Sequence, residues 1–108
     1  MRIAVLGTGV VGSALGTRLV QTGHEVRMGS RTAGNDKARA WVAAAGPAAS
    51  EGTFADAAAY GEVVVNATGG LVSLDALTAA GADNLAGKVL LDIANPLDFS
   101  GGFPPKVL

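Results

Sequence analysis

The chain contains no cysteine, which excludes a disulfide framework, a thiolate metal site and a cysteine nucleophile. This absence is consistent with a reducing cytoplasm. Charged residues are also scarce: they make up 16% of the 108 residues and leave a net charge of -1. A nearly neutral chain lacks the basic surface that binds nucleic acid or anionic lipid, so we expect neither partner. No apolar run reaches the roughly 18 residues that would span a membrane.

Short apolar runs alternate with segments of helical periodicity, and glycine-rich turns separate them. This alternation predicts an α/β fold, in which parallel strands are covered by helices on both faces. We therefore expect residues 1–108 to form one three-layer, doubly wound parallel sheet, the NAD(P)-binding Rossmann fold. The expected strands are 2–6, 25–29, 48–50, 62–67 and 89–93, followed by loop, and the expected helices are 10–22, 36–45, 54–60 and 73–80. The expected helix caps are Asn35 or Asp36, Thr53 in a capping box with Asp56, and Ser73.

A G-x-G-x-x-G motif follows the first expected strand and opens the first expected helix. In this context the first glycine allows a tight turn, the second lets a pyrophosphate approach the backbone, and the third lets the helix pack closely on the sheet. The helix N-terminus then offers free N–H groups to the phosphates. The alternative is a glycine-rich turn in an unrelated α/β fold. The cofactor-binding residues predicted here are Gly7, Thr8, Gly9, Val10, Val11 and Gly12.

The end of the second strand favours NADP(H) over NAD(H). An NAD site usually places a carboxylate there, about 20 residues after the glycine turn, to bind the ribose 2′-hydroxyl. This chain has Ser30 and Arg31 instead. A serine hydroxyl can donate to a 2′-phosphate, and a guanidinium can bind it through several donors and stack on adenine. Thr8 and Lys37 could add a hydroxyl and a charge, although Ser30 and Arg31 could also be ordinary solvated loop residues.

Two further turns lie at the carboxyl ends of strands, where ligands bind in this fold. Asn66, Ala67 and Thr68 end the fourth strand, and their small size would leave room beside the ribose and nicotinamide. Asn95 and Pro96 follow the fifth strand, where Asn95 could bond the carboxamide. No catalytic side chain is expected: the lone His24 falls in a turn at the opposite end of the sheet, and no metal site is evident.

The chain resembles the NADP oxidoreductases that use the deazaflavin coenzyme F420. The resemblance rests on the segments RIAVLGTGVVGSALGTRLVQTGHEV, MGSRTAGNDKA, VVVNATGG and LLDIANPLDFSGGFPP. It implies hydride transfer between the nicotinamide of NADP(H) and a deazaflavin or flavin-like small-molecule acceptor. It also implies that Ser30, Arg31, Lys37 and Thr8 hold the 2′-phosphate. Family members continue into a helical C-terminal region that helps form the acceptor pocket and a homodimer, and this chain stops before it.

Rossmann folds also serve other functions, and the sequence argues against one of them. A non-catalytic module that senses NADP(H) would use the same fold, because the fold does not settle function. A methyltransferase would need an acidic residue at the end of the second strand, which residues 29–31 lack. Space around the expected nicotinamide position favours the NADP-dependent oxidoreductase, although full catalysis by residues 1–108 alone is not expected.

Overall fold

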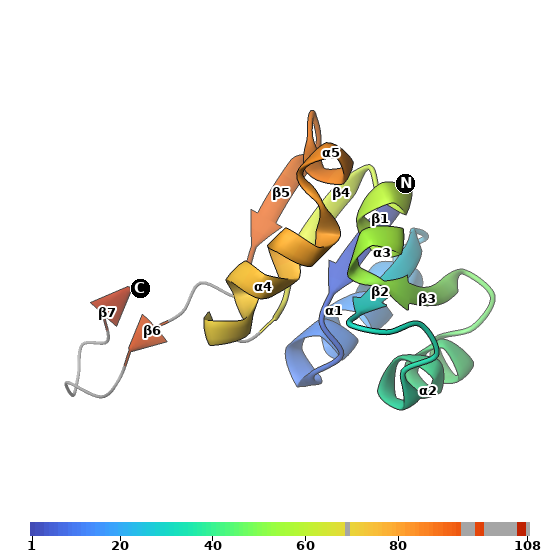
Figure 1. Cartoon of the computed structure of the whole chain (residues 1–108). Helices are drawn as coiled ribbons and strands as arrows, with labels where there is room; N and C mark the ends of the chain where they lie inside the picture. Colours follow the sequence, from blue (N-terminus) through green and yellow to red (C-terminus); the bar gives the residue numbers. More distant parts are fainter. Residues whose placement is uncertain (69, 94–96, 99–105, 108) are drawn as a thin grey trace.

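A computed structural model describes residues 1–68, 70–93, 97–98 and 106–107, and within them a five-stranded parallel sheet carries the fold (Figure 1). The strand order is β3-β2-β1-β4-β5, which places β1 and β4 side by side where the two halves of the winding meet. The expected doubly wound parallel sheet is therefore confirmed. The strands are β1 (Arg2–Leu6), β2 (Glu25–Ser30), β3 (Ala49–Thr53), β4 (Val63–Asn66) and β5 (Val89–Asp92).

The strands form because their apolar side chains can be buried on both faces of a parallel sheet. The β1 side chains from Ile3 to Leu6 are buried, and β1 pairs with β2 and with β4 along its length. Leu6 stands opposite Gly29 on one side and Asn66 on the other. The carboxyl ends of the central strands are therefore level, and the turns that follow them meet at one edge of the sheet.

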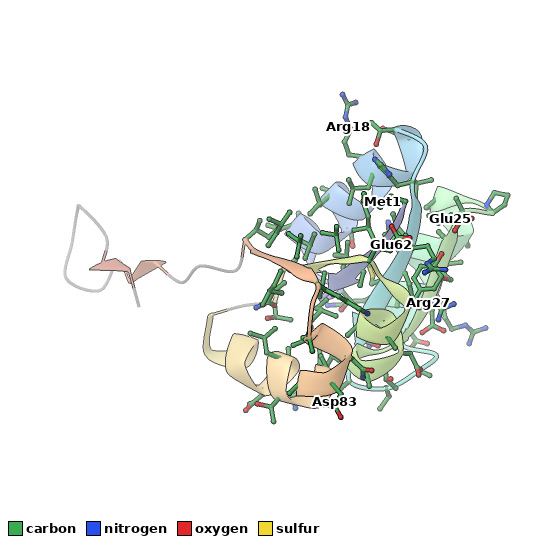
Figure 2. The ribbon with its side chains drawn as sticks, turned by 90° about the horizontal axis from the view of Figure 1, so that it is seen from above. Met1, Arg18, Glu25, Arg27, Glu62 and Asp83 are labelled. Carbon is green, nitrogen blue, oxygen red and sulfur yellow. The ribbon has the colours of Figure 1, made fainter. Side chains whose placement is uncertain are left out.

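Helices cover the two faces of the sheet, and Figure 2 shows α1 on one side with α4 and α5 on the other. The face under α1 and α2 holds one apolar cluster, in which Trp41 of α2 packs with strand residues such as Val5 and Met28. The opposite face holds a second cluster, built around Leu6, Val64 and small alanines of α3 and α4. The helices are α1 (Val10–Gln21), α2 (Asp36–Ala45), α3 (Phe54–Tyr60), α4 (Gly70–Ala80) and α5 (Ala82–Leu85).

Local hydrogen bonds define the starts of α2 and α3. The Asn35 side chain accepts from the backbone N–H groups of Lys37 and Ala38, so Asn35 caps α2. Thr53 and Asp56 form the expected capping box of α3, each side chain accepting from the other residue's backbone N–H. The cap of α1 is Gly9, which has no side chain to offer.

The structure corrects several boundaries. Helix α4 begins at Gly70, so Ser73 lies inside it and is not its cap. Strand β3 extends to Thr53, three residues beyond its expected end, because backbone pairing with β2 carries it on. The short helix α5 was not predicted. Neither was the antiparallel pair β6 (Leu97–Asp98) and β7 (Lys106–Val107), in a region expected to be loop.

The described residues include no helix that is long and apolar enough to span a membrane.

Candidate nucleotide-binding site

Of the three glycines in the turn after β1, two lie too close to neighbouring backbone to carry a side chain, and the third faces open space. Gly7 has a φ of 121°, in the left-handed region that favours glycine, and a Cβ there would lie 2.9 Å from the carbonyl oxygen of Ala67. A Cβ on Gly12 would lie 2.8 Å from the carbonyl oxygen of Gly7. Gly9 differs, because a Cβ there would meet nothing within 4 Å. Gly9 therefore faces open space, as a residue must where a ligand approaches the backbone.

The N-terminus of α1 also offers unoccupied donors. No side chain caps the helix, and its first turn contains no acidic residue. The first N–H groups of a helix have no partner within the helix, and they carry the positive end of its dipole. An anion beside Gly9 would satisfy these groups.

Ser30 and Arg31 end β2 at the same edge of the sheet, but their side chains behave differently. Ser30 is buried, and its hydroxyl donates to the carbonyl oxygen of Thr32 at 2.6 Å. Its proton is thus committed to the loop rather than directed at a ligand. Arg31 is exposed, and within the described part of the chain it makes no hydrogen bond or ion pair. Its guanidinium is the charged donor that remains available at this corner.

Asn66 and Thr68 shape the turn after β4 through their own side chains. Asn66 is fully buried, and its Oδ1 accepts from the Thr68 hydroxyl at 2.6 Å and from the Thr68 backbone N–H at 3.3 Å. The Ala67 backbone N–H donates to the carbonyl oxygen of Leu6 at 2.8 Å, which continues the pairing of β4 with β1 past the last strand residue. Asn66 therefore holds the turn, and Ala67 and Thr68 present its surface.

One cavity of about 310 Å³ joins the three turns. It is open to solvent on the carboxyl edge of the sheet, at the junction of β1 and β4, where doubly wound folds bind ligands. Arg31 is the only charged residue among the described residues that line it, and no carboxylate does. The lining residues are Gly7, Thr8, Gly9, Ser30, Arg31, Asn35, Phe54, Ala67 and Thr68.

The remaining predicted residues either do not line this cavity or lie outside the residues that the structure describes. Val10 and Val11 begin α1 and are 87% and 60% exposed, although neither lines the cavity. Lys37 is exposed in the first turn of α2 and does not line it either. Asn95 and Pro96 lie outside the residues that the structure describes.

Sequence reasoning missed Asn35 and Phe54 as lining residues. Phe54 begins α3, which packs against β2, so only the tertiary fold brings it to the cavity. A second hollow of about 220 Å³ adjoins the first and shares Arg31 and Phe54 with it; Asp75 and Ala79 of α4 complete its lining. Asp75 and Ala79 are four residues apart, so they share one face of the helix. No local signal in the sequence marks these residues as neighbours of Arg31.

The opposite end of the sheet carries charged side chains that contact neighbouring side chains. Arg27 lies with its guanidinium carbon 4.1 Å from the centre of the Tyr60 ring, and its Nε donates to the Ser50 hydroxyl. The Tyr60 hydroxyl donates to Glu25 at 3.3 Å. Burial raises the pKa of Tyr60 above its ordinary value of 10.0, and the negative charge of Glu25 raises it further. Figure 2, which looks onto this end, shows Glu25, Arg27 and Glu62 close together.

His24, in the turn between α1 and β2, lies at this amino end of the sheet, as the sequence indicated. It is therefore far along the strands from the cavity.

Residues 2–96 match the family described as NADP oxidoreductase, coenzyme F420-dependent. Among solved structures, a protein of Arthrobacter sp. FB24 that is assigned as an F420-dependent NADP reductase is 52% identical, with a TM-score of 0.83; the match covers 99% of this chain and 50% of that one. An imine reductase of Streptomyces aurantiacus is 27% identical, with a TM-score of 0.72, over 88% of this chain and 32% of that one.

A reductive aminase of Aspergillus terreus, solved with NADPH and ethyl-5-oxohexanoate, is 26% identical, with a TM-score of 0.68, over 89% of this chain and 31% of that one. The present chain thus spans half or less of the length of each of these proteins. No curated protein matches it.

Proposed function

Because the chain belongs to the family of NADP oxidoreductases that depend on coenzyme F420, we propose that it binds NADP(H) in the 310 Å³ cavity for hydride exchange with a deazaflavin or flavin-like acceptor. The observation that carries the proposal is the lining of the cavity. It joins a glycine turn to Arg31 and contains no carboxylate among the described residues. This combination favours a dinucleotide with a phosphate on its adenosine ribose over one with a free 2′-hydroxyl.

Each part of the dinucleotide has a counterpart among the lining residues. The pyrophosphate would lie against Gly9 and the first N–H groups of α1, where no side chain competes for them. The 2′-phosphate would lie beside Arg31, and the Thr8 hydroxyl could donate to it from the glycine turn. The second hollow, between Arg31, Phe54 and Asp75, offers space for the adenine.

The nicotinamide end of the cofactor would lie beside the turn after β4. Ala67 and Thr68 line the cavity there, and both are small enough to leave room for a ring. When bound, NADP(H) supplies the chemistry of hydride transfer, and the role of the protein is to bind and orient it. The described residues at the cavity therefore need no acid or base. The acceptor pocket is proposed to require residues beyond the described part of this chain.

Substitution of Arg31 tests the cofactor assignment. Arg31→Ala should weaken NADPH binding by about 1.5–3 kcal/mol, the usual worth of a hydrogen-bonded charged group, and should change NADH binding much less. Isothermal titration calorimetry with both cofactors measures the two losses. Arg18→Ala is the matched control, because it removes the same charge from the last turn of α1, away from the cavity. Equal losses for both cofactors would show that Arg31 does not read the 2′-phosphate.

Hydride transfer needs a separate assay. NADPH absorbance should fall when the full-length gene product is mixed with oxidised deazaflavin. Tight NADPH binding without turnover on deazaflavin or flavin would instead indicate a nucleotide-sensing module.

A further inference from the structure

A carboxylate from β3 holds the loop that carries Arg31. The backbone N–H of Gly34 donates to both oxygens of Glu51, at 2.9 Å to Oε1 and 3.2 Å to Oε2. Glu51 lies in the middle of β3, opposite Met28 of β2. This contact ties the loop between β2 and α2 to a residue of β3 that is 17 positions further along the chain.

The loop needs such a contact to have a defined shape. Residues 31–34 are all exposed, so burial does not fix the conformation of the loop. Gly34 has a φ of 77°, and the backbone of glycine has little intrinsic preference that would fix it either. At the start of the loop, the Ser30 hydroxyl bonds to Thr32, and at its end Asn35 caps α2. Among the described residues, Glu51 is the only residue of another strand or helix whose side chain forms a hydrogen bond with residues 31–34.

The position of this loop matters because both of its ends line the cavity. Arg31 and Asn35 are lining residues, and Gly34 immediately precedes Asn35. A guanidinium binds a phosphate well only in a defined geometry, and a loop that moves must be ordered when the ligand binds. Fixing Gly34 in advance therefore lowers the entropic cost of bringing Arg31 to a phosphate.

The negative charge of Glu51, taken by itself, would weaken the binding of a phosphate. A carboxylate near a phosphate repels it, and on that basis Glu51 would disfavour the phosphorylated cofactor. The carboxylate does not line the cavity, however, and both its oxygens are directed at the Gly34 N–H. Holding the loop and repelling the ligand thus predict opposite changes in NADPH affinity when Glu51 is removed.

We propose that Glu51 is a positioning residue for cofactor selectivity, which holds the 31–34 loop so that Arg31 can bind the 2′-phosphate. The inference rests on the proposed function. Glu51→Ala removes the acceptor, and Glu51→Gln keeps one acceptor oxygen while removing the charge. Glu62→Gln is the control, since it removes the same charge at the amino end, where Glu62 pairs with Arg2 at 3.8 Å.

Calorimetry with NADPH and NADH gives the selectivity of each variant, and thermal unfolding shows whether it is folded. Glu51→Ala should lower NADPH affinity roughly threefold to tenfold, as expected for the loss of one hydrogen bond, with a smaller change for NADH. Glu51→Gln should keep most of the preference, and Glu62→Gln should keep all of it. Tighter NADPH binding by Glu51→Ala, or equal losses for both cofactors, would overturn the proposal.

Amide hydrogen exchange separates this proposal from the proposed function. The Gly34 amide should exchange faster in Glu51→Ala than in the wild type, and Glu51→Gln should restore part of the protection. The exchange rates are expected to follow this order even if the wild type prefers NADH. A preference for NADH would refute the proposed cofactor, but it would not contradict the contact between Glu51 and Gly34. An unchanged Gly34 exchange rate in Glu51→Ala would show that Glu51 does not hold the loop.

Discussion

The two ends of the parallel sheet use the same kinds of residue in different ways. At the amino end, Arg27 stacks on Tyr60 and bonds to Ser50, and Arg2 pairs with Glu62. At the carboxyl end, Arg31 lines a cavity and has no partner within the described residues. Two glycines differ in a similar way: Gly9 of the glycine turn borders open space, whereas Gly61 at the amino end is enclosed by the backbone of Ala4 and Val63.

This contrast separates groups that stabilise the fold from groups that are available to a ligand. A charge that is already paired contributes to the folded state and has little left to offer a ligand, whereas an unpaired charge beside a cavity gains most of its interactions on binding. Changes at the amino end should therefore alter stability and spare NADPH binding. Changes at the carboxyl end should weaken NADPH binding and leave stability unchanged. The same kind of substitution made at each end tests this separation.

The largest effect is expected at Gly61, at the amino end. A Cβ there would lie 2.6 Å from the backbone nitrogen of Ala4 and 2.8 Å from the Val63 carbonyl oxygen, so α3 and β1 would have to move apart. Gly61→Ala should lower the free energy of unfolding by about 3 kcal/mol, the upper end of overpacking costs. Chemical denaturation measures this loss. NADPH affinity of the folded fraction should be unchanged, and a large loss of affinity would contradict the separation of the two ends.

The same substitution at Gly9, at the carboxyl end, should have the converse effect. Its φ of -76° suits alanine, and a Cβ there meets nothing within 4 Å, so Gly9→Ala should leave the denaturation midpoint unchanged. The added methyl group would occupy the space proposed for the pyrophosphate. NADPH affinity should fall by about 1.5–2 kcal/mol, comparable to the loss of a charge-assisted hydrogen bond. NADPH binding as tight as that of the wild type would place the pyrophosphate elsewhere.

The smallest effect concerns Tyr60, the only tyrosine in the chain. Because burial raises its pKa in the folded state, the unfolded chain ionises first as the pH rises past 10.0. The stabilisation is thus complete below pH 10.0 and is lost as the pH rises through the folded pKa. Tyrosinate absorbance should appear at higher pH in the folded protein than in urea, and Tyr60→Phe should not alter NADPH affinity. Coincident titration curves would contradict the packing described at the amino end.

The sequence predicts much of this architecture because its signals are local. The apolar strands and the Thr53–Asp56 capping box depend on residues close together in the chain, and both were confirmed. The glycine motif lies between β1 and α1 as expected. That it binds a cofactor stays a prediction. Ser30 and Arg31 were expected at the end of β2, and the structure brings both to the cavity. That they bind a 2′-phosphate stays a prediction.

The contacts that the sequence does not predict depend on pairing between distant segments. Glu51 reaches Gly34 only because β3 pairs with β2 in a particular register. Nor does the sequence indicate that the Ser30 hydroxyl bonds to Thr32, because a serine at the end of a strand has several possible partners. In each case the sequence gives the residue type, whereas the tertiary structure determines its hydrogen-bond partner.

The proposed function depends on Arg31, at the end of β2, binding a phosphate on the adenosine ribose. Calorimetric titration of the wild-type protein with NADPH and with NADH tests it most directly. NADPH should bind more tightly than NADH, by roughly tenfold or more, as expected for an added charge-assisted contact. Equal affinities, or tighter binding of NADH, would contradict it.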